Sequence, residues 1–282
     1  MSERATPRAG FGRTERLAAA LVARHDLTDA VRVLNAAGIV PMPLKGVLLQ
    51  HLVYADPSER LLSDADLLVP PGRFDEAIAA LRAAGYRIAP EGRAAASARG
   101  PNAQIEVDVH RRLFSPGLYG LKAEHLFARG RVESQLFDAL VAIPDPHDLY
   151  AHLVGNFAKG RHGAADLPQL RDFSAVASRF ALSPASVARH LERHGLARAA
   201  RYALAHAADG GDAFAAKVLA RLRLDPVGAL TAAAARGLTE RFGGGATVSL
   251  LAAHLVNSSL PRGAASAAVH VAIGLRTRLA HR

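Results

Sequence analysis

Aspartates in the first half of the chain have a spacing that suits metal binding. Asp64 and Asp66 are two residues apart and directly precede the apolar run 67–69, which is typical of a buried strand. Residues two apart on a strand point to the same side, and two carboxylates held that close disfavour each other's ionisation. A divalent cation removes that cost, and hard oxygen ligands suit Mg²⁺ or Mn²⁺. The alternative is a turn, because Ser63 and Asp64 are also turn-forming residue types.

A third carboxylate follows further along the chain. Residues 104–113 alternate between polar and apolar types, which predicts a strand with Glu106, Asp108 and His110 on one face. Glu106 is therefore a rival to Asp108 as a ligand, and we favour Asp108. His110 is a candidate for binding phosphate or for orienting Asp108, and a purely structural histidine fits the pattern equally well.

Lys45 and Gly46 precede the first aspartate pair by about 20 residues. A glycine where a strand turns into a helix lets backbone amides approach a phosphate at the helix N-terminus. Lys45 would add a positive charge there, unless it is a solvated lysine at the end of the strand. Together with the aspartates, these residues outline a site for a nucleoside triphosphate and its metal ions.

The elements that must position these residues are predicted from hydrophobic periodicity and from glycine and proline. The first half should contain helices over 14–24 and from Thr28 to Gly38, a strand over 39–44, a helix from Val47, a strand over 64–69, a helix over 74–84, and strands over 86–88 and 104–113. Pro41 and Pro43 lack an N–H on the same side, so their strand should lie at the edge of the sheet. Residues 89–103 should form a long loop rich in Gly, Ala and Arg.

The second half should be helical. Asp145 and Pro146 are the residue types of a helix cap and of a first helical position. Further helical patterns cover 167–180, 184–208, 212–222, 226–240, 246–260 and 264–280. The predicted fold class is α+β, with a flexible basic tail over 1–13, an α/β domain with a mixed sheet over 14–128 and an all-helical domain over 129–282.

Composition narrows the possible functions. The chain has 282 residues, a formal net charge of +10 and a pI near 10.7, which favours polyanionic partners unless it reflects a general bias toward Arg and Ala. Cysteine is absent, which excludes disulfides, thiolate zinc sites and a cysteine nucleophile. No apolar run approaches 18 residues and no signal-like segment begins the chain, so we expect a soluble cytoplasmic protein. Aromatic residues make up only 5%, so we expect an aliphatic core.

The order of three segments carries a resemblance to a known family. The segments are LKG at 44–46, YADPSERLLSDADLLVP at 54–70 and IEVDVHRRL at 105–113. In this order they resemble the nucleotidyltransferases of the polymerase-β superfamily, and more narrowly the bacterial uncharacterised nucleotidyltransferase family. The resemblance covers residues 39–113 firmly and the helical half more loosely. It implies a polymerase-β-like domain with a mixed sheet and flanking helices, followed by an all-helical domain that closes the cleft.

The resemblance also implies roles for individual residues. Gly46 stands where the superfamily has a Gly-Ser turn that holds the triphosphate, and because Lys-Gly replaces Gly-Ser here, the serine contact is missing. Asp64 and Asp66 would bind the metal ions. Asp108, followed by x-His as in the family pattern, would bind the catalytic metal and help to deprotonate an attacking hydroxyl. Arg60 would orient the loop or contact phosphate, with a structural salt bridge as the alternative.

The helical half carries basic residues that could serve the same site. A helical second domain often supplies such residues in this superfamily, which makes His152, Lys159, Arg161 and His162 candidates for contacting phosphates. His147 and His152 are five residues apart, whereas histidines that share a metal on a helix are usually four apart, so this pair does not predict zinc.

The expected activity is Mg²⁺-dependent transfer of a nucleoside monophosphate from a nucleoside triphosphate to a hydroxyl or phosphate. The acceptor is a small molecule, a peptide or a protein in the favoured interpretation. RNA is the alternative acceptor, as in toxins that add nucleotides to tRNA, but stacking of bases needs aromatic side chains, which are sparse here. A catalytically degenerate module that only binds nucleotide is the second alternative.

Overall fold

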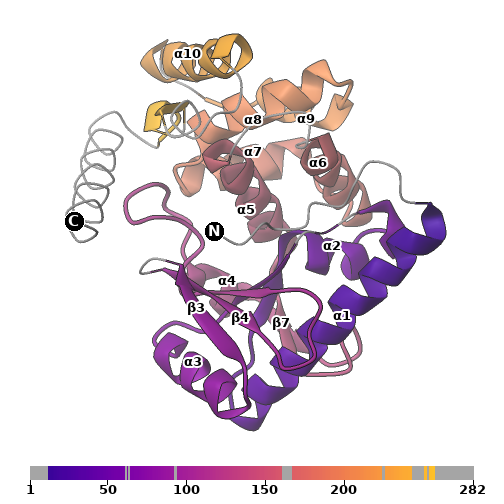
Figure 1. Cartoon of the computed structure of the whole chain (residues 1–282). Coiled ribbons are helices and arrows are strands. Elements are labelled where there is room, and N and C mark those ends of the chain that lie inside the picture. Colours follow the sequence, from indigo (N-terminus) through magenta and orange to yellow (C-terminus); the bar gives the residue numbers. More distant parts are fainter. Residues whose placement is uncertain are drawn as a thin grey trace. The chain divides into compact units, whose positions relative to one another are not determined.

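The computed structural model describes residues 12–60, 62, 64–91, 94–160, 167–223, 226–242, 251–252 and 254–257. The chain folds into two compact units (Figure 1). The first holds the described residues up to Leu113 together with Lys122–Asp145. The second holds Phe114–Leu121 and the described residues from Pro146 onward.

The first unit has the mixture of helices and strands that the sequence predicts. Its elements are α1 (Arg13–Ala36), β1 (Met42–Leu44), α2 (Lys45–Leu52), the 3₁₀ turn η1 (Pro57–Glu59), β2 (Ala65–Leu68), α3 (Phe74–Ala83), β3 (Arg87–Glu91), β4 (Ala95–Arg99), β5 (Val107–His110), α4 (Ala123–Arg129), β6 (Arg131–Glu133) and β7 (Val141–Ile143). Gly38 and Gly85 follow α1 and α3 with φ of 68° and 86°, the left-handed conformation that glycine adopts at helix ends.

A five-stranded sheet organises the first unit. Its strand order is β1-β2-β5-β4-β3, and β2 and β5 run parallel while the other neighbours run antiparallel. Between β2 and β5, Asp66 lies opposite Asp108 and Leu67 lies opposite Val109. The two apolar partners are fully buried, so β2 and β5 form the core of the sheet. The register therefore places the two predicted carboxylates side by side.

The position of β1 confirms the predicted edge strand, since β1 pairs with β2 alone in the five-stranded sheet. A small hairpin of β6 and β7 adjoins this edge, where the N–H of Ala142 donates a hydrogen bond of 2.8 Å to the carbonyl of Pro41. This contact explains why the first unit continues to Asp145, beyond residue 128.

Two sequence expectations for the first unit are corrected. The two helices expected over 14–24 and 28–38 are one continuous helix, α1. Asp26 lies in its middle, where the carboxylate accepts hydrogen bonds from the N–H groups of Gln104 and Ile105. The loop expected over 89–103 contains most of the β3–β4 hairpin instead. Its alanines have low strand propensity, and burial of Ala96 and Ala98 in the sheet overrides that preference.

The second unit is helical, as predicted. Its helices are α5 (Pro146–Lys159), α6 (Leu167–Arg179), α7 (Pro184–Arg193), α8 (Ala197–Asp209), α9 (Ala213–Leu219) and α10 (Pro226–Phe242). Pro146 takes the first position of α5 as expected. The single helix expected over 184–208 is divided into α7 and α8 at Gly195, which has a φ of 66°. Residues 1–11 and the pattern over 264–280 lie outside the described residues.

The buried core is mostly aliphatic, as expected, and in the second unit aromatic side chains pack within it. The ring of Tyr150 lies 5.8 Å from that of Phe173, and Phe157 lies 6.1 Å from Phe173 and 6.2 Å from Tyr202. All four rings are buried, and the first unit likewise buries the rings of Tyr86 and Phe137.

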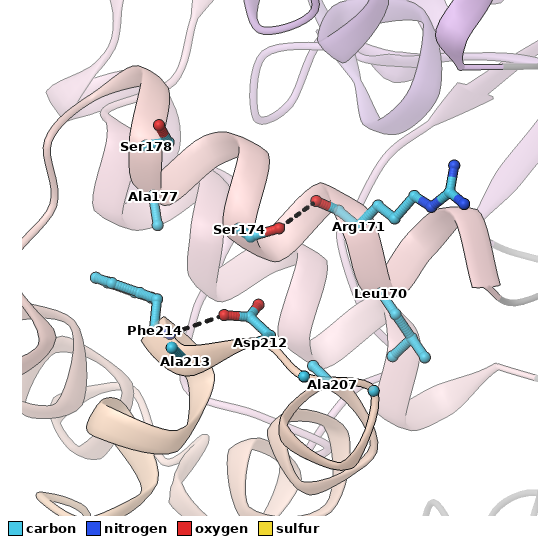
Figure 2. A pocket seen from close by; sticks show the side chains of 11 residues that line it. Leu170, Arg171, Ser174, Ala177, Ser178, Ala207, Asp212, Ala213 and Phe214 are labelled. Atoms are coloured by element: carbon cyan, nitrogen blue, oxygen red, sulfur yellow. Dashed lines mark hydrogen bonds between the residues drawn. The ribbon is translucent and has the colours of Figure 1, made fainter.

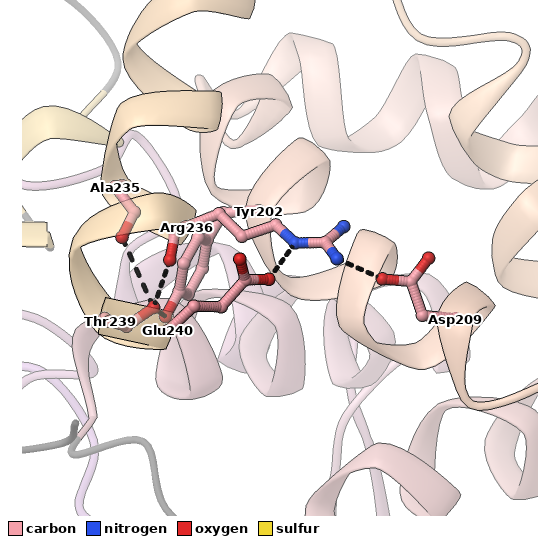
Figure 3. Close-up of polar contacts among 6 residues, drawn as sticks. All are labelled: Tyr202, Asp209, Ala235, Arg236, Thr239 and Glu240. Atoms are coloured by element: carbon pink, nitrogen blue, oxygen red, sulfur yellow. Dashed lines mark hydrogen bonds and ion pairs between the residues drawn. The ribbon is translucent and has the colours of Figure 1, made fainter. Parts of the chain in front are cut away.

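Polar contacts join α10 to α8 (Figure 3). The guanidinium of Arg236 pairs with Glu240 on its own helix and with Asp209 at the end of α8. The hydroxyl of Tyr202, which is buried in α8, donates a 3.2 Å hydrogen bond to that of Thr239. No described helix has both the length and the apolar character needed to cross a membrane.

We expect two glycines of the second unit to respond in opposite ways to substitution by alanine. A Cβ on Gly155 would lie 2.6 Å from Cζ of Phe114 and 3.1 Å from Cδ2 of Leu196, so overpacking of about 1–3 kcal/mol exceeds the gain in helix propensity of about 1 kcal/mol. A Cβ on Gly237 would meet nothing within 4 Å, so Gly237→Ala should only gain the higher helix propensity of alanine. Thermal unfolding should show a lower Tm for Gly155→Ala and a higher Tm for Gly237→Ala. An unchanged or higher Tm for Gly155→Ala would contradict the packing described for α5.

Candidate functional site

Two buried carboxylates lie next to each other at the centre of the sheet of the first unit. Asp66 is 3% exposed and Asp108 is 4% exposed. They are register partners on the parallel strands β2 and β5, and neighbouring strands lie about 4.8 Å apart. Ser97 on β4 is the next register partner, on the other side of Asp108. The sequence predicted the two carboxylates as ligands, and the sheet brings them together.

Lys45 provides the charge that balances these carboxylates. Its Nζ donates a hydrogen bond of 2.5 Å to Oδ1 of Asp66, and Asp64 and Asp108 also lie close enough to act on its charge. Lys45 is the first residue of α2 and has a φ of 52°. This left-handed conformation costs a lysine on the order of 1–2 kcal/mol. The turn from β1 into α2 therefore has a strained backbone at the residue that contacts Asp66.

His110 contributes a second hydrogen bond to the same oxygen. Its Nε2 lies 2.7 Å from Oδ1 of Asp66 and is the donor, since an ionised carboxylate only accepts. Burial alone would raise the pKa of Asp66, but the Lys45 ammonium and His110 together hold that pKa well below its usual range. Burial lowers the pKa of Lys45, and its aspartate neighbours outweigh this effect and raise the pKa. Asp66 and Lys45 are therefore both charged at neutral pH.

Asp66, Asp108 and His110 form a group that fits a divalent cation. Each offers one ligand atom, and these atoms lie within 4.8 Å of one another. Two carboxylate oxygens, one from a residue that stays ionised when buried, suit a hard cation such as Mg²⁺ or Mn²⁺. Asp64 is half-buried and immediately precedes β2, and it does not belong to this group. Its charge still acts on Lys45.

Three of the predicted phosphate-binding residues, Lys45, Gly46 and Arg60, lie at or beside the start of α2. A Cβ built on Gly46 would lie 3.9 Å from Cζ of Arg60, so the Arg60 guanidinium lies beside the first turn of this helix. The same Cβ would lie only 2.3 Å from Cδ2 of Leu62. A side chain at position 46 would therefore require the terminal methyl group of Leu62 to shift.

The other sequence candidates lie elsewhere. Glu106, the rival of Asp108, is half-buried and precedes β5. His152 and Lys159 belong to α5 of the second unit. His152 is buried and its ring lies 5.8 Å from that of Phe114, while Nζ of Lys159 lies 5.5 Å from the centre of the same ring. Arg161 and His162 fall outside the described residues.

A groove of about 670 Å³ opens between α6 and the α8–α9 connection in the second unit (Figure 2). Its charged lining residues are Arg171, which is exposed, and Asp212. Asp212 is the N-cap of α9, where its Oδ1 accepts hydrogen bonds from the N–H groups of Phe214 and Ala215. The groove therefore has volume but few groups that could do chemistry, and we place the candidate site at Asp66 and Asp108.

The comparison with protein families covers parts of both units. The sequence model of a family described as uncharacterised nucleotidyltransferase matches residues 13–209. The chain belongs to this family. The match runs from the first residue of α1 to the last residue of α8, so the nucleotidyltransferase includes both the strands that carry Asp66 and Asp108 and most of the helical unit. No curated protein matches the chain significantly.

The sequence analysis did not find a second group of metal-ligating side chains in this nucleotidyltransferase. Asp148, His190 and His194 come together in the helical unit. His190 and His194 are four residues apart, which is the usual spacing of a histidine pair on a helix. That spacing could have indicated a metal-binding pair from the sequence alone. The carboxylate that completes the group could not be recognised in the same way, because it lies 42 residues before His190.

We expect substitution of Lys45 to destabilise the first unit and a second substitution to restore it. Lys45→Met keeps the apolar stem but leaves Asp66 as a buried charge without its ammonium partner, which should lower the unfolding free energy by about 3 kcal/mol. Asp66→Asn added to Lys45→Met removes that charge and should recover most of the loss. Denaturant unfolding of the two single variants and the double variant gives the coupling energy. Additive effects would show that the pair does not act as a unit.

We also expect a pH dependence from Asp66. Because its folded pKa is lowered, its contribution to stability is fully present above the unfolded pKa of about 3.9 and is lost as pH falls toward the folded pKa. The stability difference between wild type and Asp66→Asn should be constant from about pH 5 to 8 and narrow below about pH 4. Urea unfolding across this range measures it. A difference that stays constant down to pH 2 would show that the folded state does not stabilise the ionised form.

Proposed function

We propose that this protein transfers a nucleoside monophosphate from a nucleoside triphosphate to a hydroxyl or phosphate group, with Mg²⁺ or Mn²⁺ as cofactor. The observation that supports the proposal most directly is the pair of buried carboxylates, Asp66 and Asp108, on adjacent parallel strands of a family member. Asp66 remains ionised despite its burial, which a metal ligand must do. Asp64, next to the strand, is the third proposed carboxylate.

In this proposal, some residues bind the metal ions, one orients a metal ligand and others bind the triphosphate. Asp66 and Asp108, with Asp64, hold the divalent ions, and His110 keeps the Asp66 carboxylate oriented. Bound there, the ions supply charge neutralisation for the phosphoryl oxygens and acidify the attacking hydroxyl. Lys45 and Arg60, at the first turn of α2, provide positive charge for the triphosphate, and the helix N-terminus adds its backbone amides.

The reaction is an in-line displacement at the α-phosphorus. The acceptor oxygen forms the new bond to phosphorus, the bond from the α-phosphorus to the oxygen bridging to the β-phosphate breaks, and pyrophosphate leaves with that electron pair. Asp108 accepts the proton of the attacking hydroxyl. His152 and Lys159 of the helical unit are proposed to contact phosphate. The favoured acceptor is a small molecule or a polypeptide.

Binding of nucleotide tests the proposal before the acceptor is known. Isothermal titration with non-hydrolysable analogues of the four nucleoside triphosphates, with and without Mg²⁺, should show binding that depends on Mg²⁺. Asp66→Asn and Asp108→Asn should each weaken it by at least about 100-fold, since changes outside the direct ligands already cost about 10–100-fold at metal sites. Glu106→Gln is the matched control, because Glu106 directly precedes β5 and was the rival of Asp108 as a ligand, and it should bind as wild type does.

The outcomes separate the alternatives. If Asp108→Asn still binds nucleotide in a Mg²⁺-dependent way, the nucleotide site does not lie at β2 and β5. Binding of a triphosphate with equal affinity in the presence and absence of Mg²⁺ would favour a degenerate binding module. The analogue that binds identifies the donor, which is then supplied in labelled form with candidate acceptors. Label appearing on tRNA rather than on small molecules or polypeptides would establish the RNA alternative.

A further inference from the structure

The helical unit contains a second, chemically different set of metal-ligating side chains. Asp148 lies in the first turn of α5, His190 lies in the last turn of α7, and His194 directly follows α7. Each contributes one ligand atom, and these three atoms lie within 4.8 Å of one another. The residues are 0%, 5% and 8% exposed. All three belong to the second unit, so the cluster is separate from the Asp66 group.

The backbone fixes the two histidines on one face. His190 and His194 are four residues apart, and their ring centres are 4.6 Å apart. The N–H of His194 donates to the carbonyl of His190 at 3.2 Å, and its own carbonyl accepts a 2.8 Å hydrogen bond from the N–H of Gly120. A Cβ on Gly120 would lie 3.0 Å from that carbonyl oxygen, so the segment 114–121 packs closely against the end of α7. These contacts hold His194 where it faces the cluster.

The carboxylate completes the set from a different helix. Oδ1 of Asp148 lies 2.7 Å from Nε2 of His190. Two ligands of a tetrahedral Zn²⁺ with bonds of about 2.0 Å lie about 3.3 Å apart. An ion can therefore take the place of the proton shared by His190 and Asp148 if these side chains separate by roughly 0.6 Å.

We propose that Asp148, His190 and His194 bind a divalent transition-metal ion, and that Zn²⁺ is the ion that fits best. Two imidazoles and one carboxylate are ligands typical of Zn²⁺, whereas Mg²⁺ prefers sites made only of oxygen. Such an ion ties the start of α5 to the end of α7 and stabilises the helical unit. The proposal does not depend on the nucleotidyl-transfer reaction, because it concerns different residues and a different class of ion.

His147 supplies a matched control within the same helix. It precedes Asp148, its ring lies 5.7 Å from that of His190, and its Nε2 lies 3.0 Å from the Ser186 hydroxyl. It is absent from the three-residue group among the residues that the structure describes. A variant of His147 therefore tests for general effects of removing a histidine beside the cluster.

The experiment uses the untagged full-length chain, stripped of metal by a chelator and then titrated with Zn²⁺ against a chromophoric competitor. The Asp66→Asn variant is titrated in parallel, because it removes a ligand of the Asp66, Asp108 and His110 group. Zn²⁺ that this variant still binds is therefore not bound by that group. We expect about one Zn²⁺ per chain that is retained in Asp66→Asn, is not displaced by millimolar Mg²⁺, and raises Tm by at least about 5 °C at saturating Zn²⁺.

Substitutions decide which residues bind. His194→Gln keeps a polar side chain of similar length and should weaken Zn²⁺ binding by at least about 100-fold and abolish the rise in Tm. His147→Gln should bind as wild type does. Wild type that binds no Zn²⁺ at micromolar concentrations, or His194→Gln that binds as tightly as wild type, overturns the proposal.

A spectroscopic measurement on wild type keeps the proposal testable if His194→Gln does not fold. Co²⁺ replaces Zn²⁺ in sites of this kind and has visible absorption bands that are much stronger in a four-coordinate site than in water. Such bands, abolished by one equivalent of Zn²⁺, support the site. A Co²⁺ spectrum identical to that of the aqueous ion overturns it.

Discussion

A buried, ionised carboxylate is the feature on which the first unit of this protein depends. Transferring a carboxylate from water to a protein interior costs several kcal/mol unless opposite charge and hydrogen bonds offset it. Asp66 has both, from the Lys45 ammonium and from His110. Lys45 reaches Asp66 from a left-handed backbone position, at the junction of β1 and α2. The edge strand, the first turn of α2 and the β2–β5 ladder are thus joined by one electrostatic interaction.

The same interaction links stability to the proposed chemistry. A set of carboxylates that can bind two or more positive charges destabilises a fold when those charges are missing. In this protein Lys45 supplies one positive charge from the chain itself, close to all three aspartates. The ammonium and a divalent ion would compete for the same oxygen of Asp66. Such competition would make metal binding weaker and more dependent on the accompanying triphosphate than in a site without a lysine.

Much of the fold could be predicted because local patterns determine it. The prolines at positions 41 and 43 marked the edge strand, and Gly38 and Gly85 marked the ends of helices. The β3–β4 hairpin was missed because its alanines favour helix and only packing in the sheet makes them extended. The break between α7 and α8 was missed because a single glycine does not end a helix unless its φ is positive.

The candidate site could be predicted only in part, because its residues are far apart in the sequence and become neighbours only in the fold. Asp66 and Asp108 are separated by 42 positions, and only the parallel register of β2 and β5 makes them neighbours. The alternating pattern over 104–113 suggested Asp108 as a further ligand, and the resemblance to a family supported that choice. No comparable pattern connected Asp148 with His190, which are also 42 positions apart, so a histidine pair with metal-binding spacing went unnoticed. Residues close in sequence can be paired by spacing alone, but partners on different elements require the fold.

The path of the chain through the two units has a practical consequence. The chain passes from the first unit to the second after Leu113, returns at Lys122 and leaves again after Asp145. No single cut in the gene therefore separates the units. A fragment that ends at Leu113 lacks the β6–β7 hairpin, and one that ends at Asp145 carries the segment 114–121 without the helix end on which it packs. The first unit can be produced alone only by rejoining Leu113 to Lys122, and the second only by joining Leu121 to Pro146, unless the pieces of a unit are co-expressed.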